Sequence, residues 1–219
     1  MSKNVLVGFS AIAATFFSTG AVAHERSQPA VINLSISVFN DASVSPSVLA
    51  QAQDTSAFVM RQAGISVSWL DCGAPGISPA AAGCSAISFP QHFSIRLVSK
   101  ATPAKEDIFG QSFQNDAGEG SYAIVYFPGL ASFRTTEIIH TGDLLGLVMA
   151  HELGHLLLGK NSHSATGLMC GNWRQPELHQ AARGKLLFTQ QQSSLIRSRY
   201  LAVTARLQAA QNLQTSSGK

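Results

Sequence analysis

The segment 144–158 reads LLGLVMAHELGHLLL, and it constrains the fold more than any other part of the chain. Its only strongly polar side chains are His151, Glu152 and His155. A helix that is apolar on all sides is buried, and two imidazoles and a carboxylate are costly to bury without a partner. Because residues four apart lie on one face of a helix, both histidines can reach one metal ion. We therefore expect a buried helix that ends at Gly159 and carries a metal site.

The H-E-x-x-H pattern gives Glu152 a separate role. A glutamate directly after the first histidine can lie beside a metal-bound water without being a ligand. This is the arrangement of zinc hydrolases, in which the glutamate acts as general base. The alternative is a chance match, but chance matches fall mostly on polar surface helices. The pattern therefore predicts His151 and His155 as metal ligands and Glu152 as the catalytic residue.

A third ligand is required, because a catalytic zinc normally takes three protein ligands and leaves the fourth position to water. His163 lies just past Gly159, and a glycine with positive φ can turn the chain back toward the metal as the helix ends. Glu177 would instead give a His₂Glu site, but Pro176 precedes it and we predict no helix there. We therefore expect His163 to be the third ligand. The rival candidates are Cys170, Glu177 and His179.

The stretch 151–169 resembles the zinc-binding segment of the metzincin metalloproteases. In that family two helix histidines and a third histidine past a glycine bind zinc, and a methionine in a tight turn lies beneath the metal. The resemblance implies one catalytic Zn²⁺, a general base and a Met-turn in this chain. The zinc ligands would be His151, His155 and His163. The general base would be Glu152, and the Met-turn residue would be Met169.

The spacing of this segment departs from the family pattern. In the family the glycine and the third histidine come three and six residues after the second motif histidine, whereas Gly159 and His163 come four and eight residues after it. The stretch from His163 to Met169 is shorter than in matrix metalloproteases by the same two residues. With Trp173 following, the pattern also resembles uncharacterised secreted bacterial proteins. The resemblance covers roughly residues 140–200.

Hydrophobic periodicity and turn residues predict the elements around the metal helix. We expect Ser45 and Thr189 to cap the helices that follow them, and Thr141 or Asp143 to cap the metal helix. The segments 99–120, 128–141 and 159–184 are predicted to lack regular structure, and the tail after Gln211 to fray. Strands are predicted at 31–39, 65–70, 93–98 and 122–127, and helices at 46–63, 144–158 and 190–209.

This element order predicts an α+β fold in a single domain. The sheet would be twisted, mostly parallel and four-stranded, with backing helices, the active-site helix and a C-terminal helix. The same order matches the N-terminal part of the metzincin fold, so the resemblance implies a zincin-like architecture. We expect strand 122–127 to be the sheet edge along which an extended peptide substrate adds.

The N-terminus has the features of a signal peptide. Lys3 supplies a positive charge, Val5 to Phe17 form an apolar stretch, and Ala21 to Ala23 form a small-residue cleavage site. A transmembrane anchor is the alternative, but the apolar run is short for a span. We expect cleavage near Ala23, which leaves 24–219 as the mature domain, without a membrane span, in a secreted or periplasmic location.

The cysteines and the charge fit an exported protein. Cys72 and Cys84 bracket a Gly/Pro/Ala-rich loop, which predicts a disulfide, and Cys170 is left as a small buried thiol. Charged residues make up 12% of the chain and the formal net charge is +3, which gives no argument for a nucleic-acid partner. The sequence does not indicate the oligomeric state.

These features predict a secreted zinc-dependent endopeptidase with a peptide or protein as substrate. One alternative is an exported zinc-binding protein without turnover, in which Cys170 or His179 closes the coordination of the metal. Another is a metallohydrolase of a non-peptide amide, such as a cell-wall link.

Overall fold

The computed structural model describes residues 31–73, 83–84, 88–99, 109–132 and 139–217. The predicted signal peptide therefore lies outside the described residues. The elements are arranged in the order β1, α1, β2, β3, β4, β5, α2, α3, α4 and α5. This arrangement is α+β, as predicted.

One mixed, mostly parallel sheet organises the fold, in the strand order β2-β1-β3-β5-β4. The first four strands of this order run parallel, and β4 runs antiparallel to β5 at the edge. The four predicted strands are all present, so the predicted mostly parallel sheet is confirmed, but it has five strands. The strands are β1 Ile32–Asn40, β2 Ile65–Asp71, β3 His92–Val98, β4 Gly110–Phe113 and β5 Tyr122–Tyr126.

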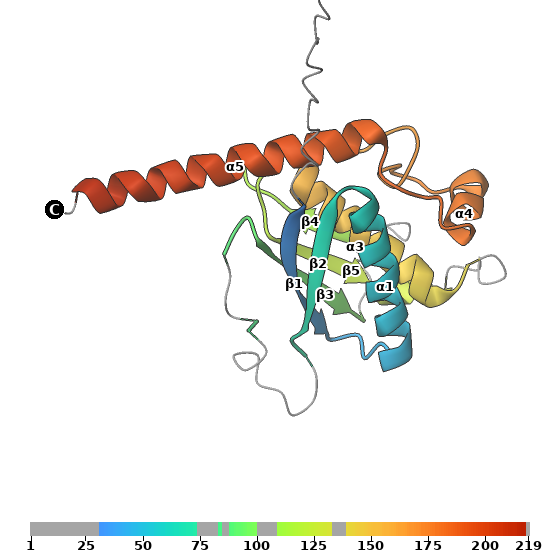
Figure 1. The fold of residues 1–219 in the computed structure, drawn as a ribbon. Helices are drawn as coiled ribbons and strands as arrows, with labels where there is room; N and C mark the ends of the chain where they lie inside the picture. The colour runs from blue at the N-terminus through green and yellow to red at the C-terminus, as the bar shows by residue number, and fades with distance from the viewer. Residues whose placement is uncertain (1–30, 74–82, 85–87, 100–108, 133–138, 218–219) are drawn as a thin grey trace, which may run out of the picture.

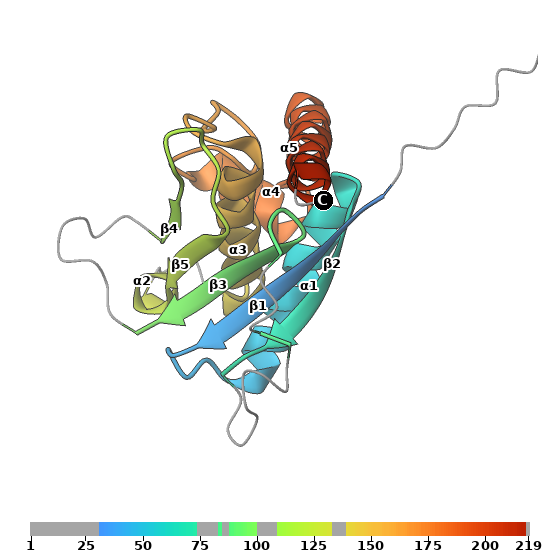
Figure 2. The ribbon, with the colours of Figure 1, turned by 90° about the vertical axis from the view of Figure 1, so that its left-hand side faces the viewer.

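Alternating apolar residues give the sheet one face that must be covered. In β1 the residues Ile32, Leu34, Ile36 and Val38 are each 5% exposed or less. Helices α1 (Pro46–Gln62) and α3 (Thr141–Leu158) lie side by side across one face of the sheet (Figures 1 and 2). The core therefore lies between this helical layer and the sheet.

The central helix α3 is buried along nearly all its length, as its apolar sequence requires. Its close approach to α1 depends on Gly146, where an added Cβ would lie 2.4 Å from the carbonyl oxygen of Ala52. The predicted end at Gly159 is confirmed, with φ at 87°. The predicted cap is wrong: His140 is the N-cap residue, and Asp143 instead accepts a hydrogen bond from Thr55 of α1 at 2.8 Å.

The segment 99–120 is predicted to be irregular, but it contains β4. Its four residues, Gly-Gln-Ser-Phe, have no apolar alternation, so the strand depends on pairing with β5 rather than on its own pattern. The expectation that strand 122–127 forms the sheet edge is also wrong. It is β5, which lies between β3 and β4, and the edge on this side is β4.

Two short helices occupy other segments that are predicted to be irregular. Helix α2 (Phe127–Ser132) comes directly after β5, and α4 (Gln175–Ala182) lies within the segment 159–184. Pro176 stands in the first turn of α4, where its missing N–H costs no hydrogen bond. Glu177, at the third helical position, accepts a hydrogen bond from the Arg174 backbone N–H at 2.9 Å. The proline and the glutamate therefore favour this helix start.

The C-terminal helix α5 (Gln190–Ser217) is longer than predicted and continues past Gln211, the point after which we expect the tail to fray. It runs past the sheet and extends beyond it (Figure 1). The predicted cap at Thr189 is confirmed: its hydroxyl accepts from the Gln192 backbone N–H at 3.2 Å, and the Gln192 side chain accepts from the Thr189 backbone N–H. Ser45, by contrast, precedes α1 without a side-chain capping bond.

Cys72 and Cys84 lie at disulfide distance, with their Cα atoms 5.8 Å apart, within the range that a disulfide requires. This pairing indicates an oxidising compartment. Most of the loop between them lies outside the described residues. Among the helices that the structure describes, none is long and apolar enough to cross a membrane.

Candidate metal centre

Three histidines converge at the C-terminal half of α3. The Nε2 atoms of His151 and His155, one helical turn apart, are 3.0 Å from each other. The ring of His163, from the loop after α3, lies with its centroid 5.4 Å from that of His151 and 4.7 Å from that of His155. One ligand atom from each residue falls within 4.8 Å of the others. The three predicted ligands are therefore positioned to bind a metal ion.

The connection from α3 to His163 accommodates its unusual length. Gly159 turns the chain with positive φ and donates its N–H to the carbonyl oxygen of His155 at 2.9 Å. Asn161 then takes a second left-handed conformation, with φ at 57°, which asparagine adopts more readily than most residues. This second turn brings the Ser162 hydroxyl to 2.7 Å from Nδ1 of His155. The longer connection thus carries both the third histidine and a partner for the second.

The hydrogen bonds of the helix histidines direct their Nε2 atoms toward each other. Nδ1 of His151 lies 2.8 Å from the carbonyl oxygen of Leu168. A carbonyl oxygen only accepts, so Nδ1 carries the hydrogen and Nε2 of the neutral ring carries a lone pair. The Trp173 indole donates to the same oxygen at 3.1 Å, and its ring meets His151 edge-on. The Nε2 lone pair of His151 therefore points toward the ring of His155. Two imidazoles arranged in this way are suited to bind one cation together.

The protonation of these two histidines also fits a metal site. Burial lowers the pKa of His151 to about 4, with the neighbouring His163 acting in the same direction and the Leu168 hydrogen bond opposing it. Burial lowers the pKa of His155 to about 3, and His151 and His163 add to the effect. Both rings are therefore neutral near pH 7, which is the form that binds a metal. A set of imidazole nitrogens suits zinc, copper, iron or nickel.

The side chain of Glu152 extends from α3 toward the edge strand β4, and the residue is 4% exposed. The Ser112 hydroxyl lies 2.6 Å from Oε2 of Glu152 and 2.8 Å from its carbonyl oxygen. Burial raises the pKa of Glu152 to about 7, and the Ser112 hydrogen bond opposes this rise. A Cβ on Gly110 would lie 2.5 Å from Oε1, so the carboxyl group occupies the space that this glycine leaves.

Met169 packs against the same helix. It is fully buried, and a Cβ on Gly154 would lie 2.5 Å from its sulfur atom. A tight turn holds it, in which the N–H of Ser164 donates to the carbonyl oxygen of Met169 at 2.9 Å and Gly167 has φ at 77°. The predicted Met-turn residue thus contacts α3 between the two helix histidines.

The rival ligands are not part of this group of three histidines. Cys170 directs its thiol to the carbonyl oxygen of Asn172 at 3.4 Å, Glu177 is engaged at the start of α4, and His179 is exposed on that helix. Among the described residues, the three histidines are the one group of this kind that could hold a metal. None of the rivals completes it.

Sequence reasoning missed the partners that hold the site. Ser112 falls in a segment predicted to be a loop, and no motif marks it. Ser162 lies in the part of the pattern that departs from the family. The Leu168 contact uses a backbone oxygen, which leaves no signal in residue type.

No protein-family model matches this chain, and no curated protein is found to be similar to it. The resemblance to metzincins therefore depends on the residues of the segment 151–169.

Proposed function

We propose that this protein is an exported zinc-dependent endopeptidase of the metzincin type. His151, His155 and His163 bind one zinc ion in this proposal, and Glu152 is the general base. The observation that carries it is the convergence of three imidazoles at α3, the helix that also carries the buried Glu152. Met169 lies beneath the metal and fixes the floor of the site.

Zinc fits this group of residues better than the other metals that imidazole binds, because three protein ligands with a fourth position left to water are typical of catalytic zinc. A bound zinc supplies a water of pKa near 7 and polarises a carbonyl group. The Leu168 carbonyl and the Ser162 hydroxyl orient two of the three rings. Such partners of the ligands tune metal affinity.

Glu152 moves the proton in this proposal. A carboxylate beside a metal-bound water can accept its proton and later release it as a general acid. The carboxylate accepts a proton from the attacking water at one oxygen and then delivers it to the leaving amine nitrogen. Ser112 holds the other oxygen of the carboxylate.

The substrate is placed along β4. Strands β2 and β4 are the two edges of the described sheet, and an extended peptide can add to such an edge through backbone hydrogen bonds. Ser112 of this strand contacts Glu152, so a peptide bound there lies beside the general base. This proposal replaces strand 122–127 with its neighbour β4, the edge strand on that side of the sheet.

Export agrees with the cysteine pair, since disulfides persist in oxidising compartments. We propose that residues 1–23 direct secretion or periplasmic delivery and are then removed.

The test is cleavage of a peptide library by the mature chain, compared with its Glu152→Gln variant. We expect zinc in both proteins, and peptide cleavage that falls at least about 100-fold in the variant. Cleavage at the wild-type rate by the variant would refute the role of Glu152. Zinc binding with hydrolysis of cell-wall amides alone, or with no hydrolysis, would support one of the two alternative functions instead.

A further inference from the structure

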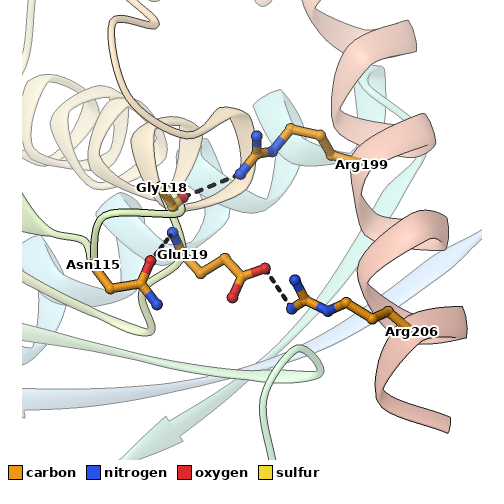
Figure 3. Close-up of polar contacts among 5 residues, drawn as sticks. All are labelled: Asn115, Gly118, Glu119, Arg199 and Arg206. Carbon is orange, nitrogen blue, oxygen red and sulfur yellow. Dashed lines mark hydrogen bonds and ion pairs between the residues drawn. The ribbon is translucent and has the colours of Figure 1, made fainter. Parts of the chain in front are cut away.

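Three segments that lie far apart in the sequence meet at Arg199 of α5. Its guanidinium donates a hydrogen bond from Nη2 to the carbonyl oxygen of Gly118 at 3.1 Å (Figure 3). It also lies against Gly159, where an added Cβ would be 2.8 Å from Cζ and from Nη2. The same side chain thus contacts the β4–β5 loop and the residue at which α3 ends.

The β4–β5 loop is shaped to present the Gly118 carbonyl to Arg199. Asn115 closes it, because its side-chain oxygen accepts from the Glu119 backbone N–H at 3.0 Å and its backbone oxygen accepts from the Gly118 N–H at 3.0 Å. Gly118 has φ at 74° and is buried against Gly159, with a Cβ position 3.5 Å from the Gly159 Cα. A second arginine, Arg206, pairs with Glu119 at 2.5 Å, as Figure 3 shows.

The Gly159 contact matters because the chain leads from this residue to the metal site. Four residues later the chain reaches His163, which is exposed, and Ser162 between them contacts His155. A ring carried on a loop is placed by the backbone that leads to it. Gly159 is the point where that backbone leaves α3, and the flat guanidinium of Arg199 covers it.

We propose that Arg199 is a positioning residue for the metal site. It fixes the α3 terminus against the β4–β5 loop, and it thereby sets where the connection delivers Ser162 and His163. The C-terminal helix α5 is then part of the metal-binding apparatus, although it supplies no ligand. This inference rests on the proposed three-histidine site.

Metal affinity measured by chelator competition tests the inference without reference to catalysis. Arg199→Ala should weaken Zn²⁺ binding by about tenfold, the low end of the effect seen when partners of metal ligands are removed. The same substitution in a background that carries both Ser162→Ala and His163→Ala should change affinity little, since both residues through which Arg199 acts are then absent. An equal loss in both backgrounds would mean that Arg199 has a general structural role, and would overturn the proposal.

Arg206→Ala is the matched control, because it removes the neighbouring arginine contact to the same loop but leaves Gly159 covered. We expect it to keep wild-type zinc affinity. Arg199→Lys tests geometry with the charge retained: a lysine can donate to Gly118, but it has no planar group to lie on Gly159. It should recover the affinity only in part, and full recovery would refute the packing argument.

Amide hydrogen exchange of the metal-free chain separates failure of this inference from failure of the proposed function. Exchange in residues 159–163 should rise in Arg199→Ala and stay unchanged in Arg206→Ala. If His163→Ala does not weaken zinc binding, the three-histidine site is wrong, yet the exchange result still decides whether Arg199 orders the loop. If His163→Ala weakens binding and Arg199→Ala alters neither affinity nor exchange, the role of Arg199 alone is refuted.

Discussion

The Ser112 hydroxyl donates to the Glu152 carboxylate at 2.6 Å and so joins the edge strand β4 to the helix that carries the two histidines. This contact places the group that moves the proton beside the strand along which we propose the substrate lies. It also makes the conformation of Glu152 depend on β4, a strand of four residues.

Replacing Ser112 with alanine should therefore lower peptide cleavage while zinc stays bound. A hydrogen bond to a charged group contributes about 1.5–3 kcal/mol, which corresponds to a loss of roughly 10- to 100-fold in kcat. Steady-state kinetics and metal content of the Ser112→Ala protein measure this. Ser66→Ala, an exposed serine on β2, is the control and should change neither. Wild-type kcat in Ser112→Ala would show that Glu152 needs no such partner.

Gly110→Ala should distort the same contact by steric means. The added Cβ would lie 2.5 Å from Oε1 of Glu152, and overpacking of this kind costs about 1–3 kcal/mol. We expect a lower free energy of unfolding in urea together with reduced cleavage. In Gly129→Ala the new Cβ would lie at least 3.5 Å from its neighbours, so that variant should match the wild type. Equal stability of the two variants would contradict the close packing at Gly110.

Ser162→Ala removes the hydroxyl that contacts Nδ1 of His155. Loss of such a partner weakens metal binding by about 10- to 100-fold, because the imidazole is no longer held with Nε2 toward the metal. Competition with a chromogenic chelator measures the change in zinc affinity. The control is Ser198→Ala, an exposed serine of α5 that bonds within its own helix. Undiminished affinity in Ser162→Ala would show that the ring is oriented by other contacts.

The stability of the metal-free protein should depend on pH through Glu152. The pKa of this carboxyl is raised to about 7 from its ordinary value of 4.5, so between these values the folded chain binds a proton that the unfolded chain has lost. The resulting stability is fully present below pH 4.5 and is lost as the pH rises through 7. His151 and His155, whose pKa values are lowered by burial, cost stability as the pH falls below 6.5.

In urea unfolding of the metal-free protein, the stability of the wild type relative to Glu152→Gln should therefore fall by about 1 kcal/mol between pH 6 and pH 8.5. Glu152→Gln cannot ionise at this position, so it keeps the opposing contribution of His151 and His155 and lacks only that of Glu152. Parallel curves for the two proteins would mean that Glu152 is not buried in its protonated form.

The central helix and the three histidines could be predicted from the sequence because each has a local signal. Helical spacing places His151 and His155 on one face, and Gly159 marks where the chain turns toward His163. The predicted strands are marked by alternating apolar residues. These features depend on short-range patterns, which survive without knowledge of the tertiary structure.

The remaining features depend on contacts between distant segments. Strand β4 exists through its pairing with β5, so neither the fifth strand nor Ser112 could be predicted from its four residues. Helix α4 escapes prediction when Pro176 is treated as a helix breaker, although a proline in the first turn suits a helix start. The contact of Arg199 with Gly118 joins residues 81 positions apart, and no periodicity in the sequence indicates it.

The measurement that tests the three-histidine site most directly is the zinc stoichiometry and affinity of the mature chain, set beside its His163→Ala and His179→Ala variants. We predict about one zinc per wild-type chain, a loss of affinity of at least about tenfold in His163→Ala, and no change in His179→Ala. A wild-type chain that binds no zinc, or a His163→Ala variant with wild-type affinity, would contradict the three-histidine site.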